Sequence, residues 1–221
     1  MARKGTGLLM VWADVPADKE DDFNRWYNEE HLAERMAIPG FLGGARYEAV
    51  KAGPKHLACY ELESAEVLQT PAYKKVQANP TEWTKRSGPG TVATTFIRNV
   101  YTMIHPRTLG PAAAAAPMAP ALQIGRMGVP AEVDREWNDW YSTVYVPNYE
   151  KVPGVIRGRR YRAVEGQPTY LTLYEFEHPK VSESAAWTAQ RDASPANEAM
   201  RKHMRHAPGS PGIYVKTFEL R

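Results

Sequence analysis

Apolar positions in the first half of the chain follow the periods of strands and helices in turn. Residues 8–13 form a short apolar run, which is typical of a strand buried on both faces. Residues 41–50 and 56–63 are rich in β-branched and aromatic side chains and are joined by a tight polar connection, so they predict a hairpin. A last strand of the same kind is predicted within residues 91–104.

Two helical regions are predicted between these strands. The first begins at Asp18, whose carboxylate can cap free N–H groups, and ends near Leu32. The second follows Thr70-Pro71 and Asn79-Pro80, in each of which a capping residue precedes a proline at the first helical position. The order of elements is therefore β-α-β-β-α-β.

The same pattern returns in the second half at a constant offset of 114 residues, which is the distance from Trp26 to Trp140. Self-similarity at a fixed offset indicates two copies of one structural unit. The matched pairs include Tyr27 with Tyr141, Pro39-Gly40 with Pro153-Gly154, Arg46 with Arg160 and Tyr60-Glu61 with Tyr174-Glu175. Pro147 falls opposite Ala33 and supports a helix end near Leu32, because proline removes a helix donor.

We therefore predict an α+β protein of two ferredoxin-like units, residues 1–104 and 121–221, joined by a Pro/Ala linker at 105–120. Each unit covers one face of its antiparallel sheet with helices, so the uncovered faces are expected to pair within one chain as a fused barrel. The alanine run Ala112–Ala116 is too short to be a stable helix unaided, and we expect it to be an exposed, extended tether. Free sheet edges would allow a further homodimer of whole chains.

Composition and charge change this picture little. The chain is 43% hydrophobic and 24% charged with a formal net charge of +3, which is typical of an ordinary globular protein rather than a nucleic-acid-coating one. The basic clusters at 157–162 and 201–206 are expected on solvated faces. The single cysteine, Cys59, excludes an intrachain disulfide and is expected as a buried strand thiol in a cytoplasmic protein. The apolar run near the N-terminus is too short for a signal peptide or a membrane span.

The residues around the first helix resemble a known family. The motif W-Y-x-x-E-H at Trp26–His31, followed by P-G-F at Pro39–Phe41 and A-R-Y at Ala45–Tyr47, is similar to the dimeric α/β-barrel superfamily, in particular its EthD-like members. The resemblance implies two sheets packed face to face and a pocket lined from the first helix and the sheets. Its members include cofactor-free monooxygenases, lactone isomerases, polyketide cyclases, dehydratases and haem enzymes, so it supports a fold more than a reaction.

The polar pair Glu30-His31 distinguishes the first copy from the second, where it becomes Val144-Tyr145. A carboxylate on an apolar helix stripe costs free energy unless it is paired or functional, so the difference favours a site in the first copy. His31 can give and take a proton near neutral pH, and Glu30 or another acid could orient it or raise its pKa. A histidine near the end of a helix is also a favourable partner of the helix dipole.

Further candidates lie on the same helix and on the strands. Tyr27 could donate a hydrogen bond to a substrate oxygen, although Tyr141 at the matching position favours packing. Arg46 is predicted either to face the barrel interior, where it would bind a carboxylate or enolate oxygen, or to be a solvated strand residue. Trp26 and the positions where one copy has an aromatic residue and the other a polar one are candidates for substrate binding: Trp12, His56, Arg126 and Tyr145.

The chain has no P-loop, no Rossmann glycine fingerprint, no nucleophile elbow and no CxxC motif, and its histidines lack the spacing of a metal site. The leading interpretation is a cofactor-free enzyme of lyase, isomerase or cyclase type, using acid-base chemistry on an apolar or aromatic oxygenated small molecule. Neither nucleic acid nor a membrane is expected as a partner. Two alternatives stay open: a haem- or O₂-dependent oxygenase or peroxidase-like enzyme with a barrel histidine as iron ligand, and a non-catalytic ligand-binding or stress protein.

Overall fold

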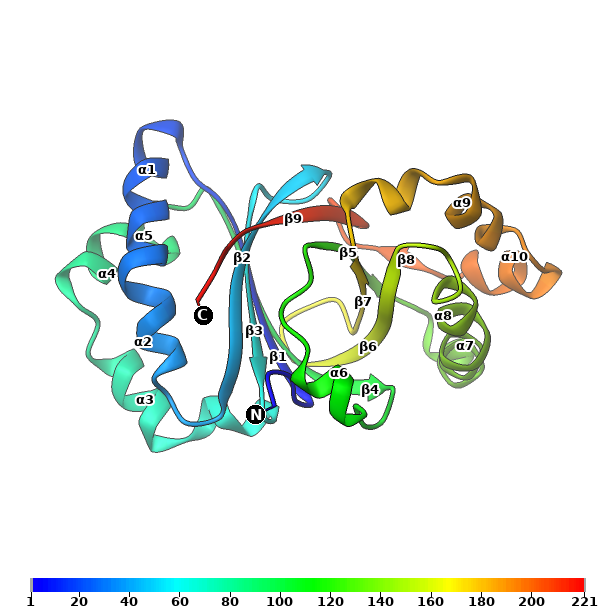
Figure 1. The fold of residues 1–221 in the computed structure, drawn as a ribbon, viewed down its shortest axis with the longest axis horizontal. Coiled ribbons are helices and arrows are strands. Elements are labelled where there is room, and N and C mark those ends of the chain that lie inside the picture. The colour runs from blue at the N-terminus through cyan, green and yellow to red at the C-terminus, as the bar shows by residue number, and fades with distance from the viewer. Residues whose placement is uncertain (1, 221) are drawn as a thin grey trace.

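The computed structural model describes residues 2–220 and places two half-barrels side by side, each with its helices on the outside (Figure 1). The strands form one antiparallel sheet in the order β7-β6-β4-β1-β3-β2-β9-β5-β8, and β5 also pairs with β7, which closes the barrel. The strands are β1 (Gly7–Asp14), β2 (Phe41–Lys51), β3 (His56–Leu62), β4 (Thr95–His105), β5 (Ala121–Gly128), β6 (Val155–Glu165), β7 (Tyr170–Phe176), β8 (Arg205–His206) and β9 (Gly212–Glu219). The predicted α+β fused barrel is confirmed.

Helices cover the outer face of each half (Figure 1). In the first half they are α1 (Ala17–Trp26), η1 (Tyr27–His31), α2 (Leu32–Met36), η2 (Ala65–Gln69), α3 (Pro71–Ala78), α4 (Glu82–Ser87) and α5 (Pro89–Val92). After α6 (Pro111–Ala115), the second half has η3 (Ala131–Val133), α7 (Asp134–Trp140), η4 (Tyr141–Tyr145), α8 (Val146–Tyr149), η5 (Pro179–Glu183), α9 (Ala185–Arg191) and α10 (Pro195–Arg201). No helix among residues 2–220 is long and apolar enough to cross a membrane.

The predicted strands are confirmed, but two helix boundaries differ from the prediction. The first helical region continues past Leu32 to Met36 as α2. Pro147 does not end the matching helix: it lies just after the π turn η4, and the chain stays helical to Tyr149. Thr70 caps α3 as predicted, whereas α4 is capped by Thr81 rather than by Asn79.

The halves join through the strands that would be edges in a single half. β2 pairs with β9, and β4 pairs with β6, so each half closes the sheet of the other. Of the described strands, only the two-residue β8 stands at the end of the sheet order. The long free edges that we expected to allow a homodimer are therefore absent from this part of the chain.

Three apolar clusters follow from the alternation of side chains along the strands. One fills the barrel interior, and the other two lie between each half-sheet and its helices. β3 and β7 are buried at every position because both of their faces are covered. Cys59 points into the barrel as a buried thiol, as predicted.

A buried ionic network lies inside the barrel and joins the halves. Arg159 donates to Glu61 at 3.0 and 2.6 Å and contacts Glu175 at 2.7 Å, and Arg157 contacts Glu175 at 3.0 Å. The prediction that the 157–162 arginines form a solvated face is therefore wrong. β6 alternates, so Arg159 points into the barrel and Arg160 points towards the helices, and both are buried.

The linker is not the extended tether that we expected. Residues Pro111–Ala115 form the short helix α6, which begins with a proline at its first turn. The Lys4 ammonium donates to the carbonyls of Ala116 and Pro117 at 2.8 and 2.6 Å and holds the segment against the barrel. Met118 is buried in the barrel interior, so the linker closes one end of that core.

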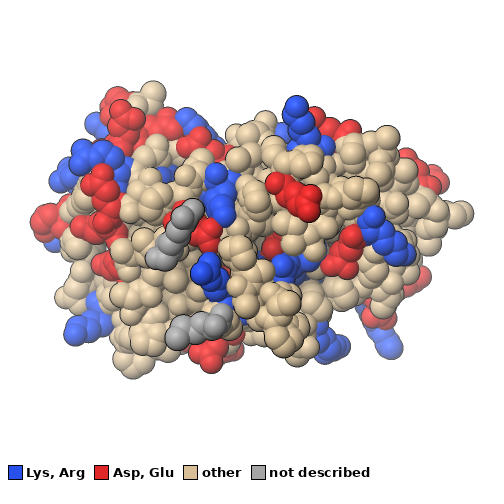
Figure 2. All heavy atoms as spheres, in the orientation of Figure 1, with Lys and Arg blue, Asp and Glu red and all other residues tan. Residues whose placement is uncertain are grey.

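Acidic and basic side chains are interspersed over the face of the molecule drawn in Figure 2. A polyanion-binding surface would instead present one sign of charge over a broad area.

Candidate functional site

A pocket of about 320 Å³ lies between the outer face of the first half-sheet and its helices. Its floor comes from β1, β3 and β4, and its walls come from α1 to α5. Several aromatic rings line the pocket. Its charged or titratable side chains include two arginines and one histidine. The residues used below are Trp26, Tyr27, His31, Arg35, Tyr60, Tyr73 and Arg98.

A π-helical turn, η1, brings Trp26 and His31 together. In a regular α-helix, residues five apart are separated by roughly 140° around the axis, so these two would lie on different sides. In the wider π turn, backbone hydrogen bonds join residues five apart. The turn therefore brings the two rings together, with centroids 4.2 Å apart. The second half has the same turn, η4, with Trp140 and Tyr145 at 4.7 Å. Isolated π turns are frequent at functional sites.

His31 is held neutral by its surroundings. Burial lowers its pKa well below the usual value, and the nearby Arg35 guanidinium lowers it further. Arg35 can only donate, so its Nε hydrogen bond of 3.4 Å assigns Nε2 of His31 as the acceptor. Nδ1 is then protonated, and it is buried without a hydrogen-bond partner, with the Glu34 carboxylate 3.6 Å away.

Two phenols and a guanidinium complete the polar part of the pocket. Burial raises the pKa of Tyr27 to about 12, so its hydroxyl stays protonated at neutral pH. The Tyr60 hydroxyl is buried and has no hydrogen-bond partner within the protein. The Arg35 guanidinium lies 5.4 Å from the centre of the Tyr73 ring. The pocket can therefore hold an oxygen of an aromatic ligand and exchange a proton with it.

Glu30 does not line this pocket, and its predicted pairing with His31 is wrong. Its carboxylate accepts hydrogen bonds from the hydroxyls of Thr81 at 2.6 Å and Thr84 at 3.4 Å, at the start of α4. The cost of a carboxylate on the apolar stripe is therefore offset by this link between the first helix and α4.

Arg46 faces outward, as one of the two expectations had it, but it is buried rather than solvated, and the inward alternative is wrong. It is 3% exposed on the outer face of β2, beneath α1. Its Nη2 donates to Asn24 Oδ1 at 2.7 Å, and its Nη1 donates to Asn28 Oδ1 at 3.2 Å. Arg160 donates to Asn138 Oδ1 at 2.7 Å in the same position of the second half. The repeated arrangement fastens the first helix of each half to its sheet.

Trp12 and Arg126 lie together inside the barrel, away from the pocket. The Arg126 guanidinium is 4.8 Å from the centre of a Trp12 ring and donates to the Pro208 carbonyl at 3.0 Å. These two residues occupy matching positions in the two copies. The difference between them therefore reflects packing across the interior, where one half supplies the ring and the other supplies the cation.

His56 lies under α1 with two carboxylates. Ligand atoms of His56, Glu20 and Glu48 lie within 4.8 Å of one another, which is compatible with a metal ion. The pKa of His56 is lowered by burial and by the adjacent Arg46, and this cation would oppose a metal ion. In the second half a 2.6 Å hydrogen bond from Tyr170 to Asp134 takes the same place, so we interpret the cluster as a helix-to-sheet contact.

Tyr145 lines a second pocket, of about 300 Å³, which lies between the second half-sheet and its helices. The structure thus brings Trp26, Tyr27 and His31 together, places Tyr145 in the matching pocket, and separates Glu30, Arg46, Trp12, Arg126 and His56 from both. Sequence reasoning missed Arg35 and Tyr60. The spacing of Arg35 four residues after His31 is a signal that could have indicated the pair.

The closed antiparallel barrel with external helices is the dimeric α/β-barrel fold, here built from one chain. No family model matches the sequence, and no curated protein matches it. Among solved structures, the chain is similar to an anthrone oxidase-like protein, with 16% identity, a TM-score of 0.65, and coverage of 100% of this chain and 95% of that one.

Two further solved structures share the fold. One is a putative monooxygenase from Fusobacterium nucleatum, with 10% identity, a TM-score of 0.58, and coverage of 97% of this chain and 94% of that one. The other is a haem-binding protein from Thermus thermophilus, with 13% identity, a TM-score of 0.56, and coverage of 99% and 92%. At these identities the likeness concerns the fold.

Proposed function

We propose that the chain is an O₂-dependent oxygenase that oxidises an electron-rich phenolic or enolisable aromatic compound in the first-half pocket. The observation that carries the proposal is the neutral, buried His31 beside the Arg35 guanidinium in an aromatic-walled pocket. Monooxygenase-like and anthrone oxidase-like neighbours on the same fold support oxygen chemistry over a lyase or isomerase reaction.

The geometry supports a reaction that begins with proton removal. The 3.4 Å bond from Arg35 to His31 is long, so a ligand oxygen can draw the guanidinium away and free Nε2 to act as base. Arg35 and the Tyr60 hydroxyl then stabilise the oxyanion of the substrate. The resulting carbanion reduces O₂ and forms a C–O bond, and protonation by His31 gives a hydroperoxide. Loss of water leaves a ketone, so a CH₂ group and O₂ give C=O and H₂O.

A haem cofactor fits this pocket poorly. The Arg35 guanidinium lies against Nε2 of His31, and the Trp26 ring packs on the imidazole, so the surroundings of this histidine favour an anionic oxygen over an iron ion. A guanidinium next to the imidazole would also oppose an iron cation. The cavity is at the low end of the sizes typical of small-ligand pockets, which suits a bicyclic or tricyclic aromatic molecule better than a tetrapyrrole.

We also propose, on the quoted motif, that the chain is an EthD-like tandem with units at 1–104 and 121–221 around a linker at 105–120. A cytoplasmic location agrees with its single buried cysteine.

The test is oxygen uptake and quinone formation with anthrone, a tricyclic ketone whose CH₂ group is acidic. His31→Tyr installs the residue of the second half, and we expect turnover to fall about 100-fold or more, the usual contribution of a proton-transfer group. Glu30→Gln is the matched control, because Glu30 is the neighbouring residue but does not line the pocket, and its turnover should stay near the wild-type rate.

Unchanged turnover in His31→Tyr would refute the base assignment. Product formed at the same rate under argon would refute oxygen chemistry and favour the isomerase or lyase alternative. A Soret band that appears on haemin titration and is lost in His31→Tyr would favour the haem alternative.

A further inference from the structure

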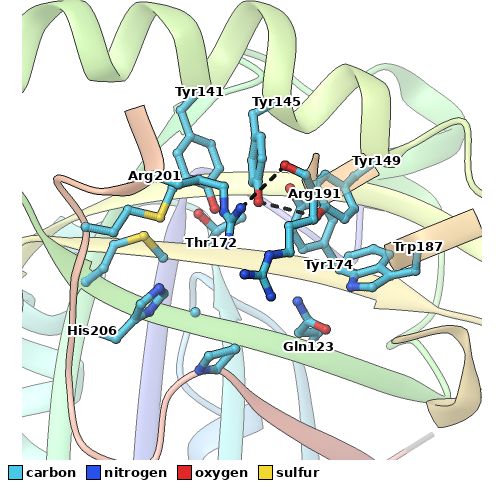
Figure 3. A pocket seen from close by; sticks show the side chains of 14 residues that line it. Gln123, Tyr141, Tyr145, Tyr149, Thr172, Tyr174, Trp187, Arg191, Arg201 and His206 are labelled. Carbon is cyan, nitrogen blue, oxygen red and sulfur yellow. Dashed lines mark hydrogen bonds between the residues drawn. The ribbon is translucent and has the colours of Figure 1, made fainter. Parts of the chain in front are cut away.

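The second half contains a pocket that the proposed oxygenase reaction does not use. It lies between β5 and β7 on one side and η4, α8, α9 and α10 on the other, and has a volume of about 300 Å³ (Figure 3). Its wall is aromatic: the Trp187 ring packs on Tyr149 with centroids 4.2 Å apart and on Tyr174 at 5.1 Å. A flat apolar ligand would contact these rings.

Buried hydroxyl groups without partners line the same pocket. The Oγ1 atom of Thr172 and the hydroxyl of Tyr174 are buried and have no well-formed hydrogen bond with the described residues, and the hydroxyl near both is that of Tyr141 in the same pocket wall. A buried hydroxyl without a partner is costly unless a ligand or water satisfies it. Tyr141 adds a third hydroxyl beside Thr172 (Figure 3). The matching first-half residue for Thr172 is Ala58, so this group is particular to the second half.

Two guanidinium groups give the pocket a positive charge. Arg191 and Arg201 both line it, and Figure 3 shows them over the same hollow as the tyrosines. Their acidic neighbour Asp192 lies 3.6 and 3.3 Å from them, but no carboxylate is among the described residues that line the pocket. At these positions the first-half pocket has Gln77 and Gly88, so the two guanidinium groups at these positions are particular to the second half. Paired guanidinium groups favour a carboxylate.

We propose that this pocket is a second binding site, for a hydroxylated aromatic carboxylate. The ring lies against Trp187 and Tyr149, the hydroxyl group exchanges hydrogen bonds with Thr172 and Tyr174, and the carboxylate pairs with the two arginines. The site differs from the first-half pocket in its hydroxyl set and in the positions of its arginines, and it acts independently of the chemistry at His31.

The test is calorimetric titration of the full chain with 4-hydroxybenzoate, and with benzoate as the ligand that lacks the hydroxyl group. Arg191→Gln with Arg201→Ser removes both positive charges, and we expect it to weaken binding of both ligands about tenfold or more, because each loses charge-assisted hydrogen bonds. Thr172→Ala installs the residue at Ala58, and we expect it to weaken 4-hydroxybenzoate several-fold while leaving benzoate unchanged. His31→Tyr is the control and should leave both affinities unchanged.

Three results would overturn the assignment. The first is no binding of 4-hydroxybenzoate at millimolar concentration, and the second is binding that survives both the arginine double variant and Thr172→Ala. The third is inorganic phosphate binding as tightly as 4-hydroxybenzoate, which would leave no role for the aromatic wall. Far-ultraviolet circular dichroism checks that each variant is folded. Anthrone turnover should be unaffected by Arg191→Gln with Arg201→Ser, so failure here and failure of the oxygenase proposal are distinguishable.

Discussion

Arg159→Met is expected to lower the free energy of unfolding by about 3–5 kcal/mol, because it removes the cation between two buried carboxylates. The Arg159, Glu61 and Glu175 side chains are at most 2% exposed, and the guanidinium lies 2.6 to 3.0 Å from the carboxylate oxygens. Arg157 still faces Glu175 at 3.0 Å, so the uncompensated charge falls mainly on Glu61. A domain has roughly 5–15 kcal/mol in total, so the loss is large.

Urea unfolding followed by tryptophan fluorescence measures the effect. With a slope of about 2 kcal/mol per molar urea, the midpoint should fall by roughly 1.5–2.5 M. Arg159→Met with Glu61→Leu removes both charges and should recover most of the loss.

A loss below about 1 kcal/mol would show that the network does not hold charged carboxylates in a dry interior.

Four further predictions follow from contacts described above. The folded chain keeps His31 neutral below its ordinary pKa, so the unfolded chain binds more protons as the pH falls. The free energy of unfolding should therefore fall by up to about 2 kcal/mol between pH 6.5 and 5. Urea unfolding at the two pH values measures this loss, and His31→Tyr should remove it. Glu30→Val should lower stability by about 1–2 kcal/mol in the same assay, because two threonine hydroxyls lose their acceptor, and equal or higher stability would contradict this role. Residues 1–104 expressed alone should be poorly soluble, because β2 and β4 lose their partners in β9 and β6; a monomer with a cooperative melt would contradict the closed barrel. Proteolytic nicking within Ala112–Ala116 should leave the halves together on a sizing column, because the barrel pairs them through strands rather than through α6.

The strands and their pairing into a barrel were accessible from the sequence because they depend on local residue types and on a repeat. The run at residues 8–13 and the hairpin at 41–63 need only β-branched and aromatic enrichment to be recognised. From Leu8 to Glu63 the first copy matches the second without a gap, so one copy corrects errors in the other.

The arrangement of the candidate site was less accessible because three features depend on tertiary structure. A regular helical period places Trp26 and His31 apart, and only the π turn stacks them. Alternation shows that Arg46 and Ala45 face opposite sides of β2, but it cannot tell which side is the barrel interior when both are covered. Glu61 has the sequence pattern of a solvent-facing strand residue, and its burial depends on Arg159, which is distant in sequence.

The presence of both half-barrels on one chain has a consequence for how the two pockets can change. In a barrel assembled from two identical chains, every substitution appears twice, so a residue that improves one pocket must also be tolerated in the other. Here the second half has Tyr145 while the matching position of the first half keeps His31. Likewise the second half has Thr172 while the first half keeps Ala58. Each pocket can therefore acquire its own ligand. The strands of the barrel and the arginine contacts that fasten each first helix still have to satisfy the same packing in both halves.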